Sequence, residues 1–76
     1  MIYTSEQRNL KLKMLGREIE KKREALQAFI KRAGHIEELG QYEQKKFDEM
    51  VERCEGLTYG EKANLKDKFS FMLTEL

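Results

Sequence analysis

Apolar residues recur at helical spacing along most of the chain, and glycines divide the pattern into three segments. The apolar stripe of the first segment comprises Leu12, Leu15, Ile19, Leu26, Phe29 and Ala33, widened by Ile30. Residues at these intervals fall within an arc of about 100° on a helix, which is enough for one buried face. We therefore expect a first helix over about 4–33, with Gly34 ending it in a left-handed conformation.

Two shorter segments repeat the pattern. A second helix is expected over about 36–55, although Gly40 leaves open whether residues 35–40 are helix or loop. Its apolar stripe comprises Ile36, Leu39, Phe47, Met50, Val51 and Cys54. A third helix is expected over about 59–75, with the stripe Leu65, Phe69, Met72, Leu73 and Leu76. Thr58 with Glu61 marks its start as a capping box, and Thr4 with Gln7 indicates a similar start for the first helix.

Short connections between these helices favour antiparallel neighbours. The expected fold is all-α: a single domain over 1–76, in which a small three-helix bundle is built on a long antiparallel helical hairpin. A chain this short buries only about 60% of its unfolded surface. Small domains often draw further stability from a partner subunit, so we expect a homodimer.

Lys22 interrupts the apolar stripe of the first helix where a heptad pattern calls for an apolar residue. Glu43 leaves a gap in the stripe of the second helix. If the two helices fold back on each other at Gly34, these residues lie about one turn apart. Two interpretations stay open. They form a polar pair that specifies the register at some cost in stability, or Lys22 lays its methylenes along the seam and reaches water.

Charge is unevenly distributed along the chain. Residues 1–34 carry nine Lys or Arg and four Glu, a net charge of +5, whereas residues 35–56 carry three basic and seven acidic side chains, a net charge of −4. Opposite charges favour pairing of the first two helices, although an exposed ion pair contributes only about 0–1 kcal/mol. The basic segment also suggests nucleic-acid binding as a function, because Arg17, Lys21 and Arg32 gather within about 60° of a helical wheel. No recognition-helix pattern or aromatic platform accompanies them, which favours a solvated face.

Some apolar residues lie outside the three stripes. Leu10 and Met14 are one turn apart on a second face of the first helix, near Arg17 and Lys21. Phe71 lies off the stripe of the third helix. A second apolar face is typical of a subunit or partner contact, although the third helix could instead cover Leu10 and Met14 within the chain. We expect these five residues to form a protein-binding surface.

No motif for catalysis, a metal or a cofactor is present. Cys54 is the only cysteine and His35 the only histidine, too few ligands for a standard zinc site. We therefore expect no enzymatic activity and no cofactor. The lone cysteine and the absence of a secretory leader favour the cytoplasm. No apolar run approaches the ~20 residues that span a bilayer, so no membrane association is expected.

These features together favour a small non-enzymatic regulator or inhibitor that binds a protein partner through a helix face. Small helical proteins of this size are common among bacterial and phage regulators, inhibitors and assembly factors, which is an analogy of size class only. Two alternatives stay open: a nucleic-acid-binding accessory protein using the basic face of the first helix, and a structural subunit of a larger assembly.

Overall fold

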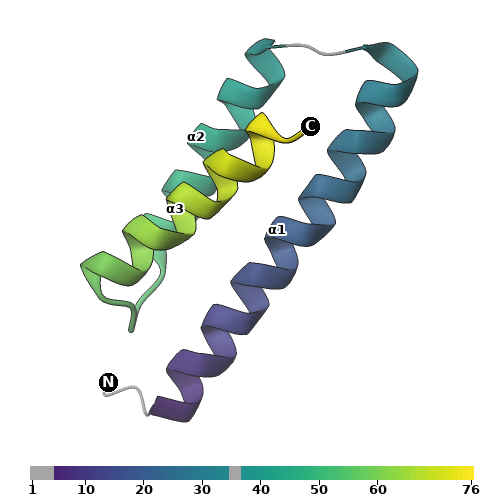
Figure 1. Ribbon diagram of the computed structural model, residues 1–76. Helices are drawn as coiled ribbons and strands as arrows, with labels where there is room; N and C mark the ends of the chain where they lie inside the picture. The colour runs from purple at the N-terminus through teal and green to yellow at the C-terminus, as the bar shows by residue number, and fades with distance from the viewer. Residues whose placement is uncertain (1–4, 35–36) are drawn as a thin grey trace.

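The computed structural model describes residues 5–34 and 37–76. Three helices dominate this part of the chain, namely α1 (Ser5–Ala33), α2 (Glu37–Arg53) and α3 (Tyr59–Thr74) (Figure 1). No strand occurs in the two described ranges. The protein is therefore an all-α three-helix bundle, and the fold class predicted from apolar periodicity is confirmed. The expected cap at Thr4 and the helical start at Ile36 lie outside the described residues.

Glycine ends α1 and follows α2 closely, because it adopts positive φ without a Cβ clash. Gly34 has φ +85° and donates its backbone N–H to the Ile30 carbonyl at 2.7 Å. Gly56 has φ +86°, and α2 ends at Arg53, two residues before the predicted limit. Gly40, by contrast, lies within α2, so residues 37–40 are helical.

The third helix is the element on which the other two pack. In Figure 1, α2 runs back along α1 and α3 returns beside both. Cα atoms of α3 come within 8 Å of Cα atoms in α1 and in α2, whereas no such pair joins α1 to α2 among the described residues. The expected α1–α2 hairpin is present as a chain reversal, but its two helices are spread apart and α3 fills the space between them.

A single apolar cluster joins the three helices. Its buried members are Leu15, Ile19 and Leu26 of α1, Phe47 and Val51 of α2, and Leu65, Phe69 and Met72 of α3. The rings of Phe47 and Phe69 are stacked, with centroids 4.3 Å apart and planes 5° from parallel. Val51 and Phe69 are 0% and 1% exposed. Burial of this apolar surface is the main stabilising contribution to the fold.

Two members of the predicted stripes, Ala33 and Met50, are exposed. Ala33 is exposed at the end of α1, beyond the reach of the shorter α3. Met50 is 38% exposed, because it lies on the side of α2 that faces the gap between α1 and α2. Helical periodicity gave the correct face in both cases, but the spread of the two helices leaves part of that face uncovered.

The start of α3 is fixed by the predicted capping box. Glu61 donates its backbone N–H to Oγ1 of Thr58 at 3.1 Å, and Thr58 donates its backbone N–H to Oε1 of Glu61 at 2.8 Å. These bonds satisfy two N–H groups that the helix itself leaves without acceptors. They offset the cost of Gly60 in the first turn, where glycine is the least favourable residue after proline.

Replacing Thr58 with Ala is expected to destabilise the protein by about 1 kcal/mol, because the N-cap hydroxyl is lost. Thr58→Ser keeps the hydroxyl and serves as the matched control, for which little change is expected. Urea titrations followed by far-ultraviolet circular dichroism measure both. Equal stability of the Ala and Ser variants would show that the cap contributes nothing to the fold.

Candidate functional site

An apolar pair on α1 faces away from the core. Leu10 and Met14 are 61% and 58% exposed, although α1 buries Leu15 and Ile19 on its other side. The alternative that α3 covers this pair is therefore wrong. We call the surface formed by Leu10, Met14, Arg17 and Lys21 the α1 outer face.

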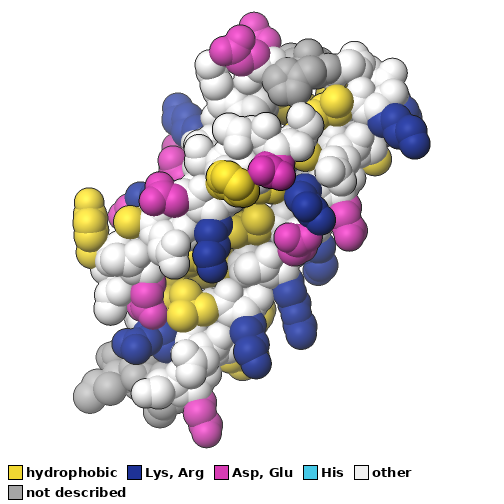
Figure 2. All heavy atoms as spheres, viewed as in Figure 1, with side chains coloured by type: hydrophobic (Ala, Val, Ile, Leu, Met, Phe, Trp, Pro, Cys, Tyr) yellow, Lys and Arg dark blue, Asp and Glu magenta, His cyan; other side chains and the backbone are white. Residues whose placement is uncertain are grey.

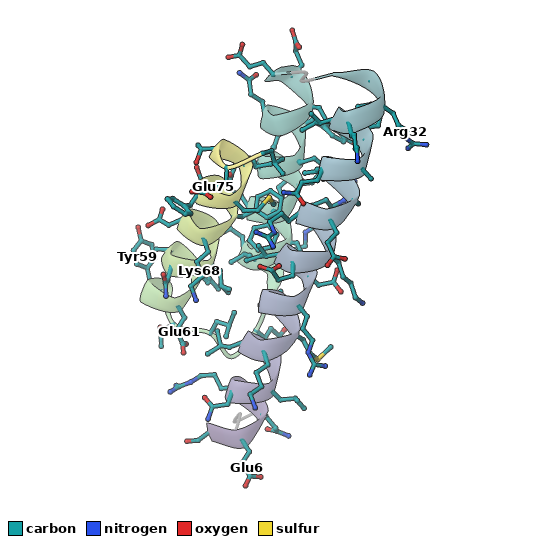
Figure 3. The ribbon with its side chains drawn as sticks, turned by 45° about the vertical axis from the view of Figure 1, so that its right-hand side comes forward. Glu6, Arg32, Tyr59, Glu61, Lys68 and Glu75 are labelled. Carbon is teal, nitrogen blue, oxygen red and sulfur yellow. The ribbon has the colours of Figure 1, made fainter. Side chains whose placement is uncertain are left out.

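Basic side chains accompany this apolar pair. Arg17 and Lys21 are both exposed, and the Lys21 ammonium lies 3.9 Å from the carboxylate of Glu18, a weak contact between residues on one helix. Arg32 is also exposed, near the far end of α1. It projects outward from the helix in Figure 3. Blue Lys and Arg side chains follow the length of α1 in Figure 2.

Phe71 does not join the α1 outer face. It is 67% exposed and borders a groove of about 390 Å³ between α1 and α3, which we call the α1–α3 groove. Residues lining it include Gly16, Glu20, Arg23, Lys68, Phe71 and Glu75. Figure 2 shows hydrophobic side chains uncovered between these two helices. The predicted partner-binding residues therefore divide between two separate surfaces.

Gly16 leaves part of the α1–α3 groove empty. A Cβ at this position would meet no atom within 4 Å, so the packing of the described chain does not require glycine there. A glycine in a helix interior costs about 1 kcal/mol relative to alanine. A glycine in the interior of a predicted helix is the signal in the sequence that could have indicated this groove.

Lys22 and Glu43 are brought together across the gap between α1 and α2. The Lys22 Nζ atom lies 3.1 Å from Oε2 of Glu43, whose side chain is 11% exposed, whereas that of Lys22 is 40% exposed. A cavity of about 270 Å³ beside the pair is lined also by Phe47, Met50 and Phe69. The ammonium is thus paired, while part of the lysine side chain remains accessible to water.

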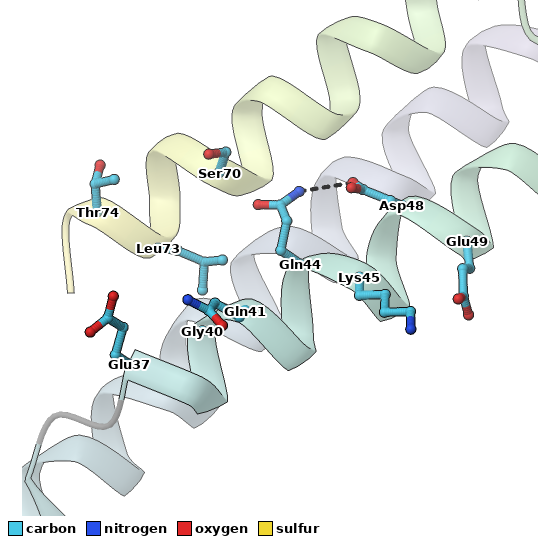
Figure 4. Close-up of a pocket in the computed structure, with 10 residues that line it drawn as sticks. All are labelled: Glu37, Gly40, Gln41, Gln44, Lys45, Asp48, Glu49, Ser70, Leu73 and Thr74. Atoms are coloured by element: carbon cyan, nitrogen blue, oxygen red, sulfur yellow. Dashed lines mark hydrogen bonds between the residues drawn. The ribbon is translucent and has the colours of Figure 1, made fainter.

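A polar groove runs between α2 and α3 on another side of the molecule (Figure 4). It has a volume of about 660 Å³ and is lined mostly by charged, amide and hydroxyl side chains, together with Gly40 and Leu73. The Gln44 amide donates to Oδ1 of Asp48 at 2.8 Å and to the Lys66 carbonyl at 3.4 Å. These hydrogen bonds hold the Gln44 side chain within the groove.

Hydrogen bonds shift the pKa values of three titratable groups near α3. A hydrogen bond from Lys66 is the main cause that lowers the pKa of Glu52, and the same bond raises the pKa of Lys66. The backbone N–H of Thr58 lowers the pKa of Glu61, which also lies 3.4 Å from Arg8. Both carboxylates favour the folded state above the usual Glu pKa, and this contribution is lost as the pH falls through their lowered values.

The described residues offer no cluster of metal ligands. They contain no group of three or more His, Cys, Asp or Glu side chains that could hold a metal ion. Cys54 is half-buried and packs against the core as a small apolar residue. His35 lies outside the described residues. Within the same ranges, no helix is long and apolar enough to cross a membrane.

Comparisons with protein-family models, with curated proteins and with solved structures find no match to this chain. The class of protein defined by its fold and surfaces is a small three-helix bundle with an exposed apolar and basic helix face.

Proposed function

We propose that this protein is a small non-enzymatic protein-binding module, a regulator or inhibitor that engages its target through the α1 outer face and acts as a homodimer. One observation carries the proposal. Leu10 and Met14 remain 61% and 58% exposed, although α1 already contributes Leu15, Ile19 and Leu26 to the core. The fold does not use this pair, whereas protein interfaces commonly centre on a few large apolar side chains.

The surroundings of the pair define the chemistry of the target. Arg17 and Lys21 are exposed beside it, and the whole of α1 carries nine basic and four acidic residues. An apolar centre with a basic rim suits an amphipathic target segment with acidic flanks, since complementary charges speed association and fix orientation. The flexible thioether of Met14 adapts to an irregular partner surface.

Replacing Leu10 and Met14 together with Gln is expected to abolish target binding while leaving the melting temperature nearly unchanged. Glutamine is a good helix former, and both positions are mostly exposed. The measurement is retention of a target by the immobilised protein from lysate of its source cells. In parallel, a photo-reactive phenylalanine analogue at position 14 should cross-link that target directly.

Tyr59 provides the matched control, because it is the most exposed large apolar residue in the described chain, at 87%. Tyr59→Gln should retain the target, and the photo-reactive group at position 59 should not cross-link it. Equal retention by the Leu10/Met14 variant and the wild type would contradict the proposal. Unfolding of that variant would also contradict it, since the pair would then have a structural role.

Nucleic-acid binding is a second candidate, favoured by the exposure of Arg17, Lys21 and Arg32 along α1. Net charge is only +1 for the whole chain, so we expect duplex DNA to bind with Kd of about 10⁻⁵ M or weaker at physiological salt. A submicromolar complex whose affinity falls steeply with added salt would instead favour nucleic acid as the target.

A further inference from the structure

We propose that two copies of this chain associate about a two-fold axis through the α1–α3 groove, with Phe71 at the centre of the contact. This inference rests on the homodimer of the proposed function and specifies its interface, but it does not depend on the target-binding surface. It uses the side of α1 that borders α3 and none of the residues of the α1 outer face. In such a dimer the α1 outer face of each copy would remain accessible to the target.

Phe71 differs sharply from its neighbours on α3. Phe69 and Met72 are 1% and 5% exposed, whereas the ring of Phe71 is 67% exposed. A single exposed apolar residue is common on protein surfaces. Phe71, however, borders a groove of about 390 Å³, so one surface carries both a projecting ring and a hollow. That combination is self-complementary, which is what a two-fold contact between identical surfaces requires.

The charges on α3 are arranged to match a second copy. Lys68 lies three residues before Phe71 and Glu75 lies four residues after it, and both project from α3 (Figure 3). Both are exposed, and within the described ranges neither side chain makes an ion pair. If two α3 helices cross antiparallel near Phe71 and Met72, Lys68 of each copy faces Glu75 of the other. Association of two copies would therefore form two ion pairs, each between Lys68 of one copy and Glu75 of the other, which the single chain does not form.

Gly16 provides room for this arrangement. The helices α1 and α3 run in the same general direction (Figure 1), which places Gly16 at the Lys68 end of the groove. The two-fold axis brings the last turn of the second copy's α3 to that end. Space within 4 Å of a Cβ at Gly16 is empty in the single chain, so the incoming helix can approach the α1 backbone closely.

A stable contact has to extend well beyond Phe71. A standard protein interface takes about 800 Å² from each partner, and the accessible surface of this chain is 5889 Å². The groove extends over two helical turns of both α1 and α3, from Gly16 to Arg23 and from Lys68 to Glu75. The contact therefore has to follow both helices along the groove, with Phe71 as its anchor.

Charge exchange at Lys68 and Glu75 tests the proposed orientation. Either single substitution, Lys68→Glu or Glu75→Lys, turns both symmetry-related ion pairs of the proposed dimer into pairs of like charge. Each single variant should therefore dimerise more weakly than the wild type. An equimolar mixture of the two restores both attractive pairs, and so does the chain that carries both substitutions. Sedimentation equilibrium at micromolar concentrations measures all five samples. Failure of both the mixture and the double variant to recover association would overturn the proposal.

Phe71→Gln tests the centre of the contact. We expect dimer dissociation to rise by about thirtyfold or more, the loss that defines an interface hot spot. Tyr59→Gln is the control and should dimerise normally, and circular dichroism should show unchanged helix content in both. A wild-type chain that stays monomeric across the concentration range would overturn the proposal. So would a dimer that survives Phe71→Gln but dissociates when Leu10 and Met14 are replaced with Gln, because the contact would then be the α1 outer face.

Discussion

Replacing Phe69 with Ala is expected to remove most of the free energy of unfolding of this protein. Phe69 is 1% exposed and stacks on Phe47 with ring centroids 4.3 Å apart. Truncation of a buried phenylalanine costs about 3–5 kcal/mol, because apolar contacts are lost and a cavity remains. A domain of this size has a total of about 4–11 kcal/mol at the usual stability per residue. So short a chain is expected at the marginal, lower end of this range, where the loss would leave the variant largely unfolded at room temperature.

Two further variants separate burial from stacking. Phe69→Leu keeps an apolar side chain but loses the ring contact, so it should lie between the wild type and Phe69→Ala. Phe71→Ala is the matched control, because the same residue type lies two positions along α3 but is 67% exposed. At concentrations below self-association its effect should stay within about 0.5 kcal/mol. Urea melts measure the series, and similar losses at positions 69 and 71 would contradict the described core.

The second large effect concerns the ion pair between Lys22 and Glu43. Replacing Lys22 with Met leaves the carboxylate of Glu43, 11% exposed, without its partner at 3.1 Å. An unpaired buried polar group costs about 1–3 kcal/mol, and the 40% exposure of the Lys22 side chain places the expected loss toward the lower end. Replacing both Lys22→Met and Glu43→Leu should recover or exceed the wild-type stability, because apolar residues often replace a buried pair favourably.

A double-mutant cycle isolates this interaction. Urea melts are recorded for the wild type, Lys22→Met, Glu43→Leu and the double variant, and the coupling free energy is the departure from additivity. Coupling larger than about 0.5 kcal/mol would show that the two charges act as a pair. Additive effects would mean that Lys22 is held by its apolar stem and contributes little through its ammonium. Arg53 and Glu49 provide a control pair, because their 3.7 Å contact is exposed and lies within one helix.

Local features of the sequence determined the secondary structure of this protein. The capping box at Thr58 and Glu61 and the chain breaks at Gly34 and Gly56 could be predicted because their chemistry acts between residues a few positions apart. Apolar residues at helical spacing likewise identified most of the core, including Leu15, Phe47 and Phe69, because the period of a helix fixes which side chains share a face. The sequence also favoured exposure of Leu10 and Met14, since the buried face was complete without them, but only the structure excluded cover by the third helix.

Only the tertiary structure decided how the apolar faces of the three helices pack against one another. The separation of α1 from α2, with α3 packed on both, depends on the volumes of side chains far apart in the sequence, and a period along one helix carries no information on them. For this reason Met50 and Ala33, which satisfy the pattern, are exposed, and Lys22 meets Glu43 across an open gap. The same packing places Phe71 on the α1–α3 groove, away from Leu10 and Met14 on the outer face of α1, because α3 lies on one side of α1 and the apolar pair lies on another.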